Sequence, residues 1–127
     1  MPNNLRNLFL LCAIVWAGVI FYLSHIPGVD VPPLFFGNDK LLHASVFGIL
    51  GFLTLGAMKT TVDDYRVFQP LLAVVLVIVY GVLDEFHQHF VPGRSPDIYD
   101  VIADALGGML GVWASYRFIK ARARKPG

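Results

Sequence analysis

The chain is poor in cysteine and in charge. Its 127 residues include one cysteine, and 15% of them are aspartate, glutamate, lysine or arginine, whereas 56% are hydrophobic. A single cysteine excludes an intrachain disulfide, and because Cys12 lies in an apolar run, we interpret it as a small packing residue. The apolar content exceeds the roughly 45–50% that is usual for soluble domains, so the composition predicts an integral membrane protein.

Charged residues are almost absent from four stretches of 16 to 18 residues, at 8–23, 41–58, 67–83 and 101–116. A helix of that length measures about 24 to 27 Å, close to the roughly 30 Å of a bilayer's hydrocarbon core. We predict an all-α fold, a small polytopic membrane protein with four transmembrane helices in a bundle. The expected helices cover about residues 6–24, 40–58, 67–89 and 97–118, and they form a single domain over residues 1–127.

A soluble four-helix bundle is the alternative fold, but it needs a polar outer face on every helix. The first and third apolar stretches have no such face. The first stretch is also longer than the apolar core of a signal peptide, and no A-x-A-like cleavage site follows it. We therefore expect it to be retained as a membrane helix.

The positive charges favour one orientation. With the N-terminus inside, ten cations divide eight to two, and lysines and arginines concentrate on the cytoplasmic side of membrane proteins. The inner group is Arg6, Lys59, Arg66, Arg117, Lys120, Arg122, Arg124 and Lys125, and the outer group is Lys40 and Arg94. We predict a protein of the cell membrane with both termini cytoplasmic. The basic tail fits orientation and anionic lipid headgroups better than nucleic acid, because no pattern of stacking aromatics accompanies it.

The last apolar stretch carries acids at helical spacing. Asp97, Asp100 and Asp104 are three and four residues apart, so they share one face of a helix. A charged group at the centre of a membrane helix costs roughly 2.5–3.5 kcal/mol, which predicts that this face is turned toward protein. Asp104 is the deepest of the three and needs a partner; the candidates are Lys40, His43 and Tyr80. The face continues into three glycines that allow close helix packing, Gly107, Gly108 and Gly111.

Polar residues also occur at the outer ends of the second and third helices. Lys40 and His43 share one face of the second helix, which Asp39 can cap. The third helix carries a comparable group, formed by Tyr80, Asp84, Glu85, His87 and Gln88. Because these ends lie on the same side of the membrane, we predict one polar cluster shared by three helices.

The turn "VPGRSPD" places an arginine between two helices that carry acids. Pro92 and Gly93 end the third helix, and Ser95 is a candidate cap for the fourth. The guanidinium of Arg94 can form a forked pair with a carboxylate or hold a phosphate. Both interpretations stay open from the sequence.

Histidines and carboxylates raise the question of a metal. His43, His87 and His89 together with Asp84, Glu85 and Asp104 offer donor atoms. However, His87 and His89 are two residues apart and point in different directions on a helix, whereas zinc motifs on helices use a spacing of four. We therefore predict no metal and no cofactor.

Three segments resemble the VanZ-like family, named for an accessory teicoplanin-resistance membrane protein. They are "SHIPG" (24–28), "DKLLHASVFGIL" (39–50) and "YGVLDEFHQHFVPGRSPDIYDVIADALGGMLG" (80–111). The resemblance implies an integral membrane protein and, for the namesake, reduced susceptibility to a drug that targets cell-wall precursors. The family more typically has asparagine at the position of Asp104. Motif positions carried over by resemblance are Asp39, Lys40, His43, Glu85, Gln88, Arg94, Asp100 and Gly107.

Three functional hypotheses follow. In the first, an outward polar pocket binds an anionic cell-envelope component, such as a lipid-linked phosphate or a peptide carboxylate, with Lys40 and Arg94 supplying positive charge. In the second, a membrane-embedded hydrolase uses His43 or His87 with a carboxylate as an acid/base pair. In the third, the network is structural, and the chain associates with itself or with a membrane partner. The network residues are Asp39, Lys40, His43, Asp84, Glu85, His87, Gln88, Arg94, Asp97, Asp100 and Asp104.

Overall fold

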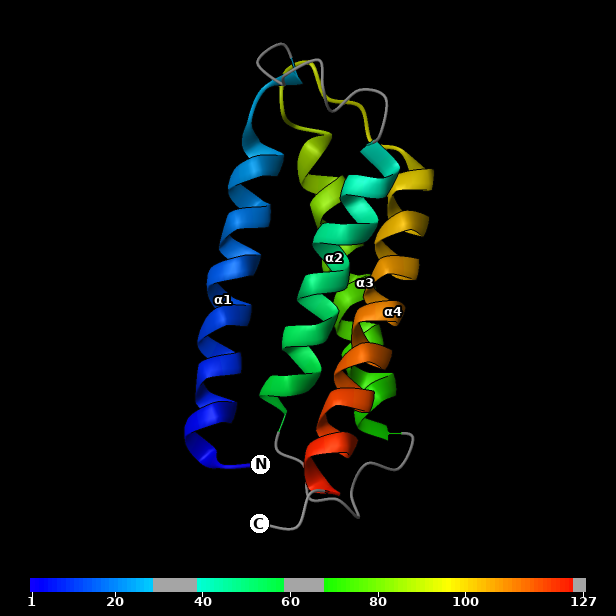
Figure 1. Ribbon diagram of the computed structural model, residues 1–127. Helices are drawn as coiled ribbons and strands as arrows, with labels where there is room; N and C mark the ends of the chain where they lie inside the picture. Colours follow the sequence, from blue (N-terminus) through cyan, green and yellow to red (C-terminus); the bar gives the residue numbers. More distant parts are fainter. Residues whose placement is uncertain (29–38, 59–67, 125–127) are drawn as a thin grey trace.

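The computed structural model describes residues 1–28, 39–58 and 68–124. They form four α-helices: α1 (Asn3–His25), α2 (Asp39–Ala57), α3 (Phe68–Gln88) and α4 (Ile98–Ala123). Successive helices run in opposite directions and lie together as one bundle, with the start of α1 and the end of α4 at the same end (Figure 1). The predicted all-α four-helix bundle is confirmed.

The fourth helix is longer than expected, because it ends at Ala123 rather than near residue 118. Its last turns carry cations that pack over the rings of neighbouring aromatic side chains. The guanidinium carbon of Arg117 lies 5.5 Å from the ring centre of Trp113, and Nζ of Lys120 lies 5.6 Å from that of Tyr116. Such contacts between residues four positions apart, about one helical turn, support helical structure beyond the apolar stretch.

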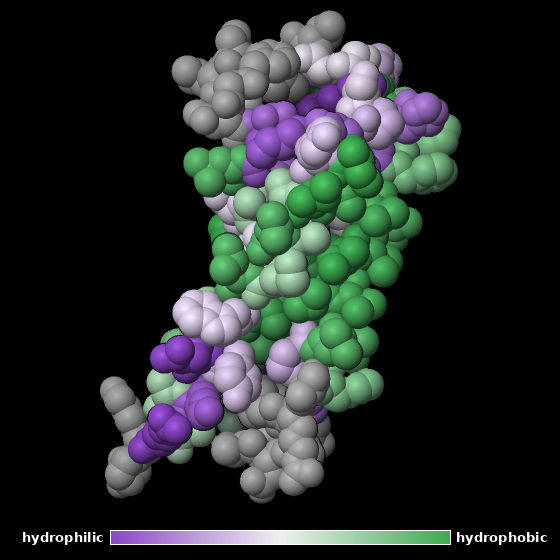
Figure 2. All heavy atoms as spheres, turned by 90° about the vertical axis from the view of Figure 1, so that its right-hand side faces the viewer, coloured by the Kyte–Doolittle hydropathy of each residue, from purple (hydrophilic) through white to green (hydrophobic). Residues whose placement is uncertain are grey.

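Three helices, α1, α2 and α3, are long and apolar enough to cross a membrane. The fourth helix has a lower apolar content because its first turns hold Asp100 and Asp104 and its last turns are basic. Its outward side chains are nevertheless apolar, among them Ile102, Leu106, Met109, Leu110 and Trp113. Figure 2 shows an apolar belt between two polar ends on one face of the molecule. A multi-pass membrane protein has this distribution of side chains.

Backbone contact joins α2 to α4. A Cβ atom on Gly107 would overlap the carbonyl group of Ala44, and one on Gly111 would overlap the carbonyl group of Gly48. Only glycine at these positions of α4 therefore permits the observed approach of the two helices. Because α2 covers this glycine face within the chain, an additional membrane partner would have to use another face.

The interior is layered along the bundle. The apolar cluster nearer the polar end contains Ile20, Phe47, Leu50 and Val77. The cluster nearer the termini contains Leu55, Ala73, Val112 and Ile119. Most of the buried polar side chains lie between the first apolar cluster and the polar end of the bundle. The candidate functional residues are therefore confined to that end.

Two hydrogen bonds attach α1 to its neighbours. The indole nitrogen of Trp16 donates to the carbonyl of Val46 at 2.9 Å, and the hydroxyl of Tyr80 donates to the carbonyl of Ala17 at 2.7 Å. Each crosses from one helix to another and satisfies a polar atom on an otherwise apolar ring. They hold α1 against α2 and α3 just below the polar end.

Candidate functional site

The buried acids gather where α2 and α4 begin and α3 ends. Antiparallel packing brings these three helix ends to one level (Figure 1), as the sequence spacing predicts. The buried polar side chains at this end are Ser24, Asp84, Glu85, Gln88, Asp100 and Asp104. We refer to this set, together with Asp39, Lys40, His43 and Asp97, as the polar cluster.

Lys40 is the positive centre of the polar cluster. Its ammonium group forms ion pairs with Asp97 at 2.6 Å, with Asp39 at 3.3 Å and with Asp100. Three carboxylates thus share one lysine and connect the start of α2 to the start of α4. The charge of Lys40 is balanced within the chain, which leaves Arg94 as the better candidate for binding an anionic ligand.

Asp97 both caps α4 and binds Lys40. Its side chain accepts a hydrogen bond from the backbone N–H of Tyr99 at 2.8 Å, so Asp97, and not Ser95, is the N-cap. The ammonium of Lys40, followed by that backbone N–H, holds the pKa of Asp97 below its ordinary value of 3.8. This aspartate lies just before α4 and outside the membrane-spanning segments.

His43 is the partner of the deepest acid. Its Nδ1 lies 2.9 Å from Oδ1 of Asp104, and its Nε2 lies 3.7 Å from Oδ2 of Asp100. Of the other two candidate partners, Lys40 binds the shallower acids and Tyr80 bonds to a carbonyl of α1. The imidazole therefore connects α2 to two successive turns of α4.

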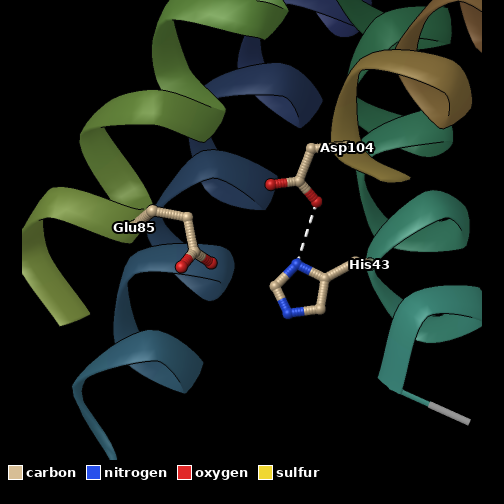
Figure 3. Close-up of side chains that lie close together, drawn as sticks. All are labelled: His43, Glu85 and Asp104. Atoms are coloured by element: carbon tan, nitrogen blue, oxygen red, sulfur yellow. Dashed lines mark hydrogen bonds and ion pairs between the residues drawn. The ribbon is translucent and has the colours of Figure 1, made fainter. Parts of the chain in front are cut away.

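Glu85 contributes a third buried group from α3. Its Oε2 accepts a hydrogen bond from the backbone N–H of Asp97 at 2.9 Å. The donor atoms of His43, Glu85 and Asp104 all lie within 4.8 Å of one another. Figure 3 shows these side chains converging from α2, α3 and α4, whereas the sequence spacing does not single out these three members of the predicted cluster as neighbours.

The other acid of α3, Asp84, lies toward α1 rather than α4. It accepts a hydrogen bond from the side chain of Gln88 at 3.2 Å, one turn later, and also interacts with Ser24 of α1. The adjacent acids of the "DEF" sequence are thus divided, with Asp84 toward α1 and Glu85 toward α4.

The two other histidines of the sequence motif lie apart from His43. His87 pairs with His25 of α1, with Nε2 and Nδ1 3.2 Å apart, and its ring centre is 4.7 Å from that of Phe21. His89 is exposed and packs edge-on against Phe90. Within the described residues, the structure therefore brings only His43 into the group of buried acids.

Arg94 binds the end of α1. Its Nε donates to the carbonyl of Ile26 at 3.1 Å, and its Nη2 donates to that of Leu23 at 3.3 Å. Carbonyls at a helix C-terminus lack intrahelical partners and carry partial negative charge, which suits a guanidinium. Among residues 1–28, 39–58 and 68–124, no carboxylate lies within 4.0 Å of Arg94. The sequence allows a carboxylate or a phosphate as the partner of Arg94. The structure adds a third partner, the backbone carbonyls at the end of α1.

Arg94 also lines a pocket of about 90 Å³ between α1, α2 and α3. The apolar lining residues are Ile20, Leu23, Leu42, Val46 and Phe47, and the polar ones are Ser24, His43, Asp84, Gln88 and Arg94. The sequence identified four of the polar residues but none of the apolar ones, because nothing in their pattern distinguishes them from other positions in membrane helices. Ser24 is the first residue of the "SHIPG" segment that resembles the family, but its contact with Asp84 could not be inferred from the sequence.

Fold and site together define a small multi-pass membrane protein with a buried polar cluster at one end. The VanZ/LLP1 family model matches residues 9–120, and the chain belongs to this family. A protein of Schizosaccharomyces pombe described as "Uncharacterized protein C11E3.10" is 30% identical over 122 residues, which cover 95% of this chain and 70% of that protein. No solved structure matches the chain.

Proposed function

We propose that the pocket binds the headgroup of an anionic cell-envelope lipid, such as a lipid-linked phosphate, and that Arg94 is its anchor. The observation that carries this proposal is the state of Arg94, which lines the pocket and has no carboxylate partner among the described residues. Its carbonyl contacts engage Nε and Nη2, and a guanidinium has five N–H donors. Donors therefore remain for phosphate oxygens.

The lining of the pocket suits an amphiphile. Apolar side chains such as Leu42 and Phe47 form one part. The polar part contains one carboxylate, that of Asp84, together with Ser24, His43, Gln88 and Arg94. A volume of about 90 Å³ accommodates a headgroup rather than a whole lipid. The acyl or prenyl chain would thus stay in the bilayer beside the helices.

The charge distribution supports an outward-facing pocket in the cell membrane. Arg6 at the start of α1 and the cations at the end of α4 lie at the end opposite to the polar cluster, as the positive-inside rule requires for cytoplasmic termini. The cations Lys59, Arg66 and Lys125, which the orientation prediction also uses, lie outside the described residues.

Binding can be measured by native mass spectrometry of detergent-purified protein with a polyprenyl phosphate. We expect one lipid per chain, loss of binding in Arg94→Gln, and weaker binding in Arg94→Lys, which keeps the charge but not the planar fork. Arg117→Gln removes an exposed arginine at the opposite end and serves as the matched control. Equal lipid occupancy in Arg94→Gln and Arg117→Gln would contradict the proposal.

The proposal extends to the glycopeptide teicoplanin. A protein that holds a lipid-linked cell-wall precursor changes how much precursor the drug can reach. We expect expression of the chain in a susceptible bacterium to raise the inhibitory concentration of teicoplanin, and Arg94→Gln to remove the increase at equal membrane abundance. An unchanged inhibitory concentration would show that this chain does not reduce susceptibility to teicoplanin. Lipid binding would still be decided by the mass-spectrometry assay.

One observation favours a hydrolase as a second candidate function. His43 lines the pocket and is held by Asp104, so an acid or base is positioned beside the proposed headgroup. Release of phosphate from a polyprenyl pyrophosphate by the purified protein, abolished in His43→Gln, would establish the hydrolase. Binding without turnover would favour a binding or transport role.

A further inference from the structure

Two buried carboxylate oxygens lack a protein partner. Oε1 of Glu85 and Oδ2 of Asp104 make no hydrogen bond within the part of the chain that the structure describes. Glu85 is 4% exposed and Asp104 is 0% exposed, so the surrounding side chains shield both from bulk solvent. Burying an ionised carboxylate without compensation is strongly unfavourable, and these oxygens therefore call for a proton or a positively charged group.

The chain itself offers little positive charge to these two acids. Among the described residues, the ammonium of Lys40 pairs with three other aspartates, and the guanidinium of Arg94 donates to backbone carbonyls. The acids at this end number six within the described residues, against these two permanent cations; they are Asp39, Asp84, Glu85, Asp97, Asp100 and Asp104. The excess of negative charge favours a bound cation over a neutral molecule.

We propose that His43, Glu85 and Asp104 bind one divalent transition-metal ion, for which zinc is the best match. Their donor atoms lie within 4.8 Å of one another and point into a common space (Figure 3). One imidazole nitrogen with two carboxylate oxygens suits zinc, whereas magnesium and calcium prefer oxygen ligands throughout. Three protein ligands also leave a coordination position open.

The surroundings of His43 fit a metal ligand. Nδ1 faces Asp104 and serves as the donor atom, while Nε2 lies 3.7 Å from Oδ2 of Asp100. Histidine ligands commonly direct their second ring nitrogen toward a carboxylate, which fixes the tautomer and the ring orientation. Asp100 takes this outer position and is itself held by Lys40.

The separation of the donors predicts how the protein responds. Donors around a tetrahedral zinc ion are about 3.4 Å apart, less than the 4.8 Å limit observed here. Zinc would replace the 2.9 Å hydrogen bond between Nδ1 of His43 and Oδ1 of Asp104, whose atoms would separate slightly, while the more distant donors would move closer. The ion would thus link α2, α3 and α4 at one point. From the sequence, all three residues are among the possible donors but no metal is predicted, because these ligands come from three helices and form no local motif.

This site stands independently of the lipid proposal, because it rests on buried oxygens and not on Arg94. One connection rests on the proposed function: His43 also lines the pocket, so an ion there would add positive charge beside an anionic headgroup. Metal binding and lipid binding are measured separately, so either can fail without the other.

The test uses the full chain, purified in detergent and stripped of metal. After incubation with Zn²⁺ and desalting, we expect elemental analysis by inductively coupled plasma mass spectrometry to find one zinc per chain. We also expect a higher Tm than in the stripped protein. With Co²⁺, we expect visible absorption bands typical of four-coordinate cobalt, which Zn²⁺ then abolishes. Because the cobalt and zinc measurements need only the wild-type chain, they decide the proposal even if variants fail to fold.

Isosteric variants locate the site. Glu85→Gln and Asp104→Asn should each lower the affinity for zinc by at least about 10-fold, the range seen even for outer partners of metal ligands. His43→Gln should also remove the four-coordinate cobalt spectrum. Asp39→Asn is the matched control, because it removes a carboxylate at the same end of the bundle outside the triad. Absence of zinc from folded wild-type protein, or equal affinity in Asp104→Asn and Asp39→Asn, would overturn the proposal.

Discussion

Asp104 and His43 are 61 residues apart in sequence, yet their side chains meet at 2.9 Å and join α4 to α2 inside the bundle. The carboxylate is fully buried and the imidazole is partly buried. Asp104 cannot reach solvent while α2, α3 and α4 stay packed, so its hydrogen bond to His43 depends on the packing of the helices.

Replacing Asp104 by leucine should therefore destabilise the bundle. The leucine leaves His43 without its partner, at a cost of roughly 1–3 kcal/mol, whereas asparagine can still accept a hydrogen bond and should be tolerated. Thermal unfolding in detergent, in metal-free buffer, measures both variants. A Tm for Asp104→Leu equal to that of the wild type would show that His43 needs no partner on α4.

Adding one methyl group should have opposite effects at two glycines. Gly107→Ala places a Cβ where the carbonyl group of Ala44 lies, so we expect a clear loss of stability. Gly18→Ala on the exposed face of α1 meets nothing within 4 Å and should be neutral or stabilising by about 0.5–1 kcal/mol, the usual gain of alanine over glycine in a helix. Paired melting curves test this, and a stable Gly107→Ala protein would disprove direct backbone contact.

Asp97 should make the protein sensitive to acid. Its pKa is lowered in the folded state, first by Lys40, so its stabilising effect is present above about pH 4 and is lost as the pH falls through the folded-state pKa. The fall in Tm between pH 7 and pH 3 should be smaller in Asp97→Asn than in the wild type. Lys40→Met should reduce it as well, because it removes the first cause of the shift. Parallel pH profiles for all three proteins would rule out this linkage.

The attachment of α1 should depend on two aromatic donors. Trp16→Phe and Tyr80→Phe each remove one hydrogen bond to a carbonyl of a neighbouring helix, and each should cost about 0.5–1.5 kcal/mol. Because both bonds hold the same helix, α1 should detach first in the double variant. An added protease should then cleave α1 before the other helices unfold. Cleavage of α1 at the wild-type rate in the double variant would contradict this role.

The sequence was sufficient for the helices and for the acidic face of α4, because apolar length and helical spacing are local properties. It also indicated that Asp104 needs a partner, since a carboxylate at that depth cannot face lipid. It could not identify His43 from among the candidates, because the choice depends on how α2 is rotated about its axis. The position of Arg94 was beyond prediction for another reason, since its partners are backbone carbonyls, which no residue type reveals.

The polar partners of α2 impose an order on assembly in the membrane. Lys40 and His43 find their acids on α4, which leaves the ribosome some sixty residues after the start of α2. During synthesis α2 therefore enters the bilayer with Asp39 as the one partner that its own helix gives Lys40 in the finished bundle, and with His43 still lacking Asp104. Completion of the bundle is consequently a late event, and a chain interrupted before α4 would leave the polar end of α2 without its partners Asp97, Asp100 and Asp104.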